Sequence, residues 1–133
     1  SMPDTIEGFG GFAVPDAGAA ATFYREVLGL VVTETNGMLW IDLPGGARVL
    51  AYPKGDHEPA AFTILNLVVP DLPAAIDDLV ARGARFERYD GFGQDERGIQ
   101  HGRGRGPDIA WTTDPGGNVI AVMERTQDPE GAA

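Results

Sequence analysis

The sequence contains no cysteine, and serine occurs only at Ser1. Disulfides, zinc–thiolate sites, iron–sulfur clusters and thiol or serine nucleophiles are therefore excluded. Basic residues are scarce, because 10 Lys and Arg stand against 20 Asp and Glu, which gives a formal net charge of -10. A chain this acidic binds nucleic acid and anionic membranes poorly. No apolar run approaches the roughly 20 residues of a membrane span.

The start of the chain lacks the features of a secretory signal, since residues 1–5 contain neither a basic segment nor an apolar one. We expect an N-terminal tail here, with Ser1 left over from cloning, and a cytoplasmic protein. The length of 133 residues and the apolar content of 43% predict one domain with a real core. The 19 Gly and 10 Pro predict many turns and short strands.

Two short patterns occur twice in the chain, in the same order. Val14-Pro15-Asp16 returns as Val69-Pro70-Asp71, and the run from Trp40 to Gly46 is echoed by the run from Trp111 to Gly117. The second half is longer between its two patterns, and the excess falls in a Gly-rich stretch over 90–107. Two matches in one order indicate an internal duplication.

Each half predicts the element order βαβββ. In the first half we expect strands over 9–14, 31–35, 38–43 and 48–52, and a helix over 19–28. In the second half we expect strands over 62–69, 84–89, 109–113 and 118–124, and a helix over 71–81. Asp16 and Asp71 are the predicted helix caps, Gly29 and Gly83 the predicted helix ends, and Asn36-Gly37 a tight turn. The expected organisation is a tail over 1–5, a module over 6–53, a linker over 54–60, a module over 61–125 and a frayed tail over 126–133.

Two segments carry a resemblance to a known family. They are the run Phe23-Tyr24-Arg25-Glu26-Val27-Leu28-Gly29-Leu30, which follows Val14-Pro15-Asp16, and the turn Asp114-Pro115-Gly116-Gly117-Asn118. With them the chain resembles the vicinal oxygen chelate superfamily, which includes glyoxalase I, bleomycin-resistance proteins and extradiol dioxygenases. The resemblance covers the chain from about Ile6 to Glu124. It implies an α+β fold in which two tandem βαβββ modules form an incomplete barrel around a cleft.

The same resemblance implies where a metal would be held, because enzymes of this superfamily bind a divalent ion on His, Gln or Glu side chains of the cleft. The implied ligand positions fall on Phe9, Ala51, Ile64 and Ala121 of this chain. None of these residues, and none of their immediate neighbours in the sequence, is His, Glu, Asp or Gln. Apolar side chains cannot supply the nitrogen or oxygen donors that a metal needs. We therefore expect no metal and no cofactor, as in the bleomycin-resistance type.

Strand alternation indicates which side chains line the implied cleft. Leu39, Ile41 and Leu43 form an apolar set that faces the helix, so their neighbours face the cleft, and pseudo-symmetry places Trp111 like Trp40. A flat aromatic or amphipathic organic molecule would stack between the two indoles, with Asn66 orienting it. The candidate ligand-binding residues are Met38, Trp40, Asp42, Asn66, His101, Trp111 and Met123. In the alternative interpretation the two tryptophans fill the barrel or a dimer interface.

The segment from Asp90 to Pro107 is either a mobile surface loop or a lid over the cleft, and its Gly- and Arg-rich part could cradle an anion. His57 is either a solvated linker residue or the partner of Asp56 or Glu58.

Three functions remain open: a small-molecule-binding protein, an enzyme, and a structural or regulatory dimer. The enzyme would be a lyase, isomerase or dioxygenase with a displaced metal or metal-free acid–base chemistry, and its candidate residues are Asp42, His57, Asp95, Glu96 and His101. The sequence favours the binding protein, and open sheet edges predict a homodimer.

Overall fold

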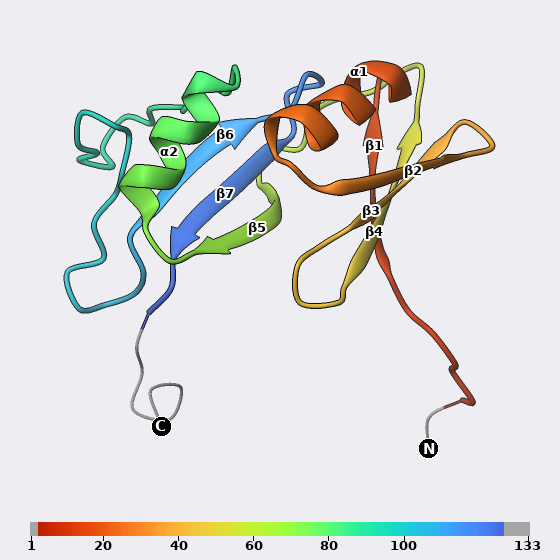
Figure 1. Cartoon of the computed structure of the whole chain (residues 1–133), viewed down its shortest axis with the longest axis horizontal. Coiled ribbons are helices and arrows are strands. Elements are labelled where there is room, and N and C mark those ends of the chain that lie inside the picture. Colours follow the sequence, from red (N-terminus) through yellow and green to blue (C-terminus); the bar gives the residue numbers. More distant parts are fainter. Residues whose placement is uncertain (1–2, 127–133) are drawn as a thin grey trace. The chain divides into compact units, whose positions relative to one another are not determined.

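The computed structural model describes residues 3–126, which form two compact units, one ending at Pro59 and the other beginning at Ala60 (Figure 1). The class is α+β, as predicted, because each unit combines one sheet with helical turns. Ser1 and, apart from Thr126, the predicted frayed tail lie outside the described residues. Within residues 3–126, no helix has the length and apolar character needed to cross a membrane.

The first unit has the predicted order βαβββ. Its elements are β1 (Gly10–Val14), α1 (Ala17–Thr22), the π-helix η1 (Phe23–Val27), β2 (Val31–Thr35), β3 (Met38–Asp42) and β4 (Arg48–Pro53). The sheet order is β1-β4-β3-β2, with β1 parallel to β4 and the other pairs antiparallel. The Asp16 carboxylate accepts from the Ala19 N–H at 3.0 Å and so caps α1, as predicted. Asn36 and Gly37 have φ values of 52° and 77°, which confirms the tight turn between β2 and β3.

The predicted helix over 19–28 is α-helical only to Thr22 and continues as the wider turn η1. The Leu28 N–H donates to the Phe23 carbonyl, five residues earlier, at 3.1 Å. This turn brings two consecutive aromatic side chains, Phe23 and Tyr24, into the core, with ring centroids 5.2 Å apart and planes at 87°. Gly29, at φ 69°, ends the helical segment, as predicted.

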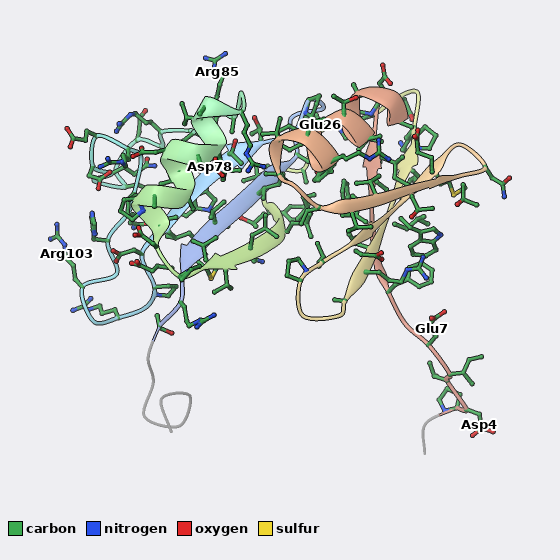
Figure 2. All side chains as sticks on the ribbon, in the orientation of Figure 1. Asp4, Glu7, Glu26, Asp78, Arg85 and Arg103 are labelled. Carbon is green, nitrogen blue, oxygen red and sulfur yellow. The ribbon has the colours of Figure 1, made fainter. Side chains whose placement is uncertain are left out.

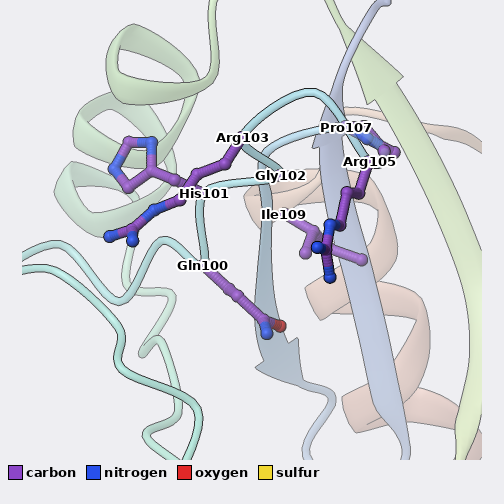
Figure 3. Close-up of a pocket in the computed structure, with 8 residues that line it drawn as sticks. Gln100, His101, Gly102, Arg103, Arg105, Pro107 and Ile109 are labelled. Carbon is purple, nitrogen blue, oxygen red and sulfur yellow. The ribbon is translucent and has the colours of Figure 1, made fainter.

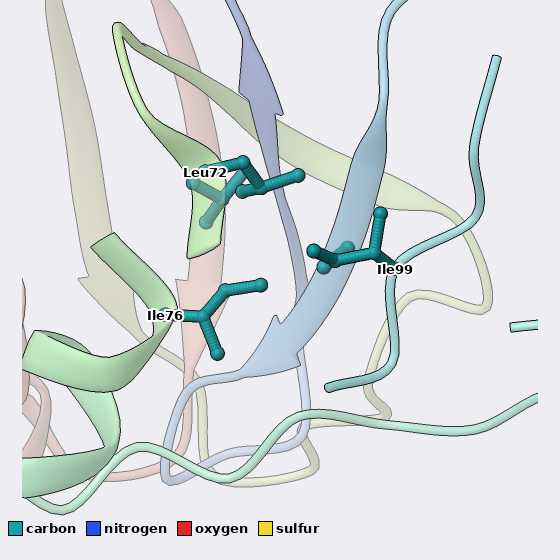
Figure 4. Packing of buried hydrophobic residues seen from close by; sticks show 5 residues of the cluster. Leu72, Ile76 and Ile99 are labelled. Atoms are coloured by element: carbon teal, nitrogen blue, oxygen red, sulfur yellow. The ribbon is translucent and has the colours of Figure 1, made fainter. Parts of the chain in front are cut away.

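The second unit contains β5 (Thr63–Val69), α2 (Leu72–Ala81), β6 (Ile109–Thr113) and β7 (Val119–Glu124). Its sheet order is β5-β7-β6, with β5 parallel to β7 and β6 antiparallel to β7. The Asp71 carboxylate caps α2 by accepting from the Ala74 N–H at 3.1 Å. The core under α2 consists of Leu72, Ile76, Ile99, Ala110 and Val122 (Figure 4). Ile99 belongs to the long segment between α2 and β6, so that segment is anchored to the core at this point.

The predicted strand over 84–89 is wrong, because in this stretch only Phe86 pairs with the sheet, as an isolated bridge to Thr112. Beyond this bridge, where the Glu87 N–H donates to the Trp111 carbonyl, three backbone groups of the segment bond to one side chain. Gln94 accepts from the Tyr89 N–H at 2.7 Å and donates to the carbonyls of Glu87 and Gly98 at 2.9 and 2.7 Å. The amide of Gln94 thus replaces a neighbouring strand, and the chain folds back on itself after Tyr89.

The turn between β6 and β7 is built around the buried carboxylate of Asp114, which is 4% exposed. One of its oxygens accepts from the N–H groups of Gly116 and Asn118, both at 2.9 Å, and the other accepts from the Asn118 side-chain amide at 3.1 Å. The Asn118 side-chain oxygen in turn accepts from the Ala60 N–H at 3.4 Å. This turn therefore ties the start of the second unit to the hairpin that carries Trp111.

Candidate functional site

A pocket of about 460 Å³ opens on the second unit around Trp111. Trp111 is half-buried on β6, whereas its neighbours Ala110 and Thr112 are fully buried on the opposite face of the strand. Strand alternation therefore turns the indole away from α2, as predicted. We call this the Trp111 pocket, and its lining consists of Ala61, Phe62, Thr63, Tyr89, Phe92, Trp111 and Val119.

Three aromatic rings of the Trp111 pocket contact one another. The centroid of Trp111 lies 5.6 Å from that of Tyr89 and 5.4 Å from that of Phe92, with interplanar angles of 75° and 72°. The rings of Tyr89 and Phe92 are themselves 5.4 Å apart. Edge-to-face contacts of this kind stabilise by about 0.5–1.5 kcal/mol each beyond area burial. The rings therefore hold one another in place and present faces and edges to a ligand.

Sequence reasoning missed Tyr89 and Phe92 as site residues. The chain brings them to Trp111 because Gln94 holds the backbone of Tyr89 where a strand was expected. A signal was present in the run Tyr89-Asp90-Gly91-Phe92, where two aromatic residues open the Gly-rich insertion. Large aromatic side chains at the start of a long polar loop need a surface to cover, and the half-buried Trp111 supplies one.

One carboxylate lies beside this apolar pocket. Glu87 accepts a hydrogen bond from the Thr113 hydroxyl at 3.3 Å, and its backbone N–H donates to the Trp111 carbonyl at 2.8 Å. Burial raises the pKa of Tyr89, and the negative charge of Glu87 raises it further, so the phenol stays neutral and remains a hydrogen-bond donor at neutral pH. The pocket thus combines three aromatic rings with a neutral phenol and a nearby negative charge.

Asn66 and Met123, both predicted as site residues, lie on the same face of the sheet as Trp111. Strand pairing puts Asn66, Ala121 and Trp111 in one row across β5, β7 and β6. Met123 lies in the next row, between Val68 and Ile109. Asn66 is exposed, and Met123 is half-buried. Neither residue lines the Trp111 pocket itself, so they lie on the face that continues from it.

In the first unit the face of β3 that carries Trp40 is the one predicted. Leu39 and Ile41 are fully buried, whereas Met38 and Asp42 are exposed and Trp40 is half-buried. The indole already has partners within its own unit. The Arg48 guanidinium carbon lies 3.8 Å from the ring centroid, and the Phe9 ring meets the indole edge-on at 4.7 Å. Trp40 therefore has a cation on its face, which Trp111 does not have among the described residues.

His101 is held between two carboxylates of the long segment. Its Nδ1 lies 2.9 Å from Asp108 Oδ2 and its Nε2 lies 2.8 Å from Asp95 Oδ2. These hydrogen bonds to Asp95 and Asp108 raise the pKa of His101, since both contacts favour the doubly protonated ring. Partial burial raises the pKa of Asp95. Its hydrogen bonds outweigh this effect and bring the pKa below its usual value, and they come from the Ile99 N–H, the His101 ring and the Arg97 N–H. An imidazolium with both N–H groups engaged has no free lone pair, so this arrangement does not present His101 as a base.

The remaining acid–base candidates are Asp42 and His57 in the first unit and Glu96 in the second. Asp42 is exposed at the end of β3, and Glu96 is exposed in the long segment, where its carbonyl accepts from Arg88. His57 lines an open hollow of the first unit together with the ion pair of Lys54 and Asp56.

The residues at the positions implied for a metal do not fit one. Phe9 is 52% exposed beside Trp40, and Ala121 is fully buried between Asn66 and Trp111. Ala51 is fully buried on the helix side of β4, so the expectation that it faces outward is wrong by one residue. The outward residues there are Leu50 and Tyr52, which carry no metal-binding group other than a phenol. Over residues 3–126, no group of three or more His, Asp or Glu side chains is placed to hold a metal ion.

Comparison with known proteins gives a consistent result. A family model described as a glyoxalase-like domain matches residues 11–123. A protein of the glyoxalase/bleomycin resistance/dioxygenase superfamily from Sphaerobacter thermophilus is 20% identical, with a TM-score of 0.64 over 90% of this chain and 98% of the other. A glyoxalase/bleomycin resistance protein from Catenulispora acidiphila is 25% identical, with a TM-score of 0.60 over 92% and 100%. TnmS3, an antibiotic-binding protein from a Streptomyces species, is 22% identical, with a TM-score of 0.62 over 91% and 98%. No protein of curated function matches the chain.

Proposed function

The chain belongs to the family of glyoxalase-like domains, within the vicinal oxygen chelate superfamily, and from this premise we propose that it binds a small, flat organic molecule at the Trp111 pocket without a metal. The observation that carries the proposal is the contact of Trp111 with Tyr89 and Phe92 around a hollow of about 460 Å³. That volume lies within the range of about 300–1,000 Å³ found for small-molecule sites. One structural neighbour is an antibiotic-binding protein, which is compatible with sequestration.

Binding would rest on stacking and burial. A planar ligand over the indole would bury apolar surface of Phe62 and Val119 and would meet the ring edges of Tyr89 and Phe92. Each aromatic contact contributes about 0.5–1.5 kcal/mol beyond the area term. The neutral phenol of Tyr89 would supply a directed hydrogen bond. Asn66, Met123 and His101 would contact the parts of a larger ligand that extend beyond the pocket.

A cationic ligand would bind more tightly than a neutral one of the same shape. The ring faces attract a cation, and the carboxylate of Glu87 lies beside Thr113 at the margin of the pocket. The net charge of -10 would also raise the rate of encounter. The Arg48 guanidinium 3.8 Å from the ring centroid of Trp40 supports this expectation, since it is a cation on an indole face of the same chain.

The test uses two probes with the same ring system, 2-naphthylmethanol and 2-naphthylmethylammonium, titrated by calorimetry and by the indole N–H resonances of the ¹⁵N-labelled chain. The two tryptophans give two resonances, and Trp40→Phe identifies the one from Trp111. We expect this resonance to shift in a saturable way and the ammonium probe to bind more tightly. Trp111→Ala should weaken binding tenfold or more, because the stack and its buried area are lost. Trp111→Phe keeps a ring face and should weaken it much less. Equal affinity for Trp111→Ala and the parent chain would refute the proposal.

Trp40→Ala tests whether both indoles take part. If the ligand is clamped between Trp40 and Trp111, together with Met38 and Asp42 of β3, this substitution also weakens binding tenfold or more. If binding is restricted to the Trp111 pocket, the affinity is unchanged. Thermal melts of both variants separate the clamp from a structural role, because truncation of a core tryptophan would lower the unfolding free energy by about 3–5 kcal/mol.

We also propose that the protein is a homodimer. Among residues 3–126, the open sheet edges are β1 and β2 in the first unit and β5 in the second, and large apolar side chains on two of these strands are exposed, Val31 at 63% and Val68 at 60%. Such edges and patches are usually covered by another chain or element. Sedimentation at tens of micromolar should show twice the chain mass of 14.1 kDa, and a monomer at that concentration would contradict the proposal.

A further inference from the structure

The hairpin formed by residues 100–109 has no part in the stacking described above, although its sequence of alternating Gly and Arg is unusual in so acidic a chain. We propose that this hairpin is a second site, which binds the phosphate or carboxylate groups of a small molecule. The site is a hollow of about 570 Å³ in the second unit (Figure 3). Its polar lining comes from Gln100, His101, Arg103 and Arg105.

The backbone fixes the form of this hairpin. Gln100 and Ile109 exchange two backbone hydrogen bonds, at 2.8 and 3.0 Å, and the Arg105 N–H donates to the Gly102 carbonyl at 3.0 Å. The chain passes so close at its base that a Cβ on Gly102 would collide with the carbonyl of Gly106. Arg103 has a φ of 53°, a left-handed conformation that is uncommon for a residue other than glycine. The directions in which Arg103 and Arg105 leave the chain are therefore set by the fold.

The carboxylates nearest to the hairpin are already engaged. Asp108 accepts from His101 with one oxygen and from the Gly102 N–H, at 2.9 Å, with the other. Asp95 accepts from His101 with one oxygen and from the N–H groups of Arg97 and Ile99 with the other. Every carboxylate oxygen of this pair thus has a hydrogen-bond donor. Neither acid forms an ion pair with Arg103 or Arg105 among the described residues.

Arg103 and Arg105 have no carboxylate partner within residues 3–126, whereas Arg25, Arg82 and Arg97 each form an ion pair. Both arginines are exposed, in a chain that has twice as many acidic as basic residues. With a protonated His101, the five charged side chains here carry three positive and two negative charges. The hairpin is therefore locally positive on a chain of net charge -10.

The geometry indicates the class of ligand. A guanidinium offers paired N–H donors that match the oxygens of a phosphate or a carboxylate. In Figure 3, Arg103 extends on the side of His101 and Arg105 on the side of Ile109, with the Gln100 amide below. A ligand that meets both guanidinium groups therefore carries more than one oxyanion group. The hollow is large enough for a molecule of that kind.

The experiment titrates the ¹⁵N-labelled full-length chain with pyrophosphate and, separately, with citrate, at constant ionic strength. We expect saturable shifts of the Gly102, Gly104 and Gly106 amide resonances, and the probe that binds more tightly assigns phosphate or carboxylate chemistry. The double variant Arg103→Gln/Arg105→Gln should raise the Kd at least tenfold. The matched control is Arg85→Gln/Arg125→Gln, which removes the same charge from two exposed arginines that also lack a carboxylate partner among the described residues. Arg85 and Arg103 both project outward in Figure 2.

The control should change the Kd by less than twofold. Two results would overturn the proposal: the absence of saturable shifts at the hairpin with either probe, or an equal loss of affinity in the two double variants, which would indicate general charge attraction. This readout is separate from that of the Trp111 pocket, because the naphthyl probes act on an indole resonance and the oxyanions on hairpin amides. Either site can therefore fail without the other.

Discussion

Gln94→Ala should damage the Trp111 pocket although Gln94 does not line it. The Gln94 amide makes three hydrogen bonds to the backbone, with the Tyr89 N–H and with the carbonyls of Glu87 and Gly98, at 2.7–2.9 Å. Alanine leaves those three groups without their partner. Each bond contributes about 0.5–1.5 kcal/mol net. Because Gln94 is half-buried and water can replace part of the loss, we expect the unfolding free energy to fall by about 2 kcal/mol.

The effect on binding follows from geometry. Without Gln94, the segment that carries Tyr89 and Phe92 loses its fixed backbone, so the two rings no longer stay at 5.6 and 5.4 Å from Trp111. The ligand then has to order them again, and we expect the affinity for 2-naphthylmethylammonium to fall about tenfold, which corresponds to about 1.4 kcal/mol.

Urea unfolding and calorimetry measure the two effects on the same samples. Gln100→Ala is the control for stability, since it removes an amide of equal size from the same segment without breaking a side-chain hydrogen bond among the described residues. It should change the unfolding free energy by less than about 0.5 kcal/mol. If Gln94→Ala alters neither stability nor affinity, the claim that this side chain replaces the missing strand is refuted.

Three further predictions concern the metal, the buried turn and the histidine clamp. The purified protein should contain no stoichiometric divalent metal, because the positions implied for a metal carry poor donors, namely Phe9, Ile64, Ala121 and the outward residues of β4. Elemental analysis that finds about one Zn, Ni, Fe or Mn per chain at these positions would contradict this prediction. Asp114→Ala should lower the unfolding free energy by about 3 kcal/mol, because two backbone N–H groups and the Asn118 side-chain amide lose a buried charged acceptor. Asp114→Asn should lower it less, and denaturant melts of both variants check this order. The pKa of His101 is raised, so its stabilising effect is complete below the ordinary histidine pKa near 6.5 and is lost as the pH rises through the higher folded value. The pKa of Asp95 is lowered, so its effect is complete above the ordinary aspartate value and is lost as the pH falls through the lower folded value. NMR titration of His101 should therefore give a pKa above 6.5 that Asp95→Asn lowers, and an ordinary pKa in the parent chain would show that the clamp does not form in solution.

The parts of the fold that the sequence predicted are those with a local cause. Asp16 and Asp71 cap their helices, Gly29 ends a helical segment, and Asn36-Gly37 forms a tight turn, because each of these residue types has a backbone preference that neighbours rarely override. Strand alternation likewise turned Trp40 away from the helix, since burial of one face fixes the register of the whole strand, and pseudo-symmetry placed Trp111 in the same way.

The parts of the fold that the sequence did not predict depend on contacts between different segments of the chain, which no single strand or turn pattern reveals. The stretch over 84–89 has the apolar alternation of a strand, but Gln94 binds the Glu87 carbonyl and the Tyr89 N–H, and no local pattern marks a glutamine for that role. The π-turn at Phe23 likewise has no local signal in the sequence, and both aromatic side chains at its start, Phe23 and Tyr24, are buried in the core. Tyr89 and Phe92 entered the site as a result of the first of these departures.

The two halves of the chain share helix caps and the parallel pairing of their first and last strands, but the side chains around their tryptophans differ. Trp40 and Trp111 occupy equivalent strand positions, yet Trp40 is covered by Arg48 and Phe9 of its own unit. Trp111 instead meets Tyr89 and Phe92, which lie just before and within an insertion that the first half lacks. The same insertion carries His101 and the two arginines of the hairpin, which form no ion pair within residues 3–126. A duplicated module is constrained by its caps, turns and core, so new chemistry is most easily added where an extra segment can fold over one sheet face. We therefore place the specificity of the proposed sites in the segment between α2 and β6. A chimaera that shortens this segment to the length found in the first half should keep the fold of the sheet and lose both sites.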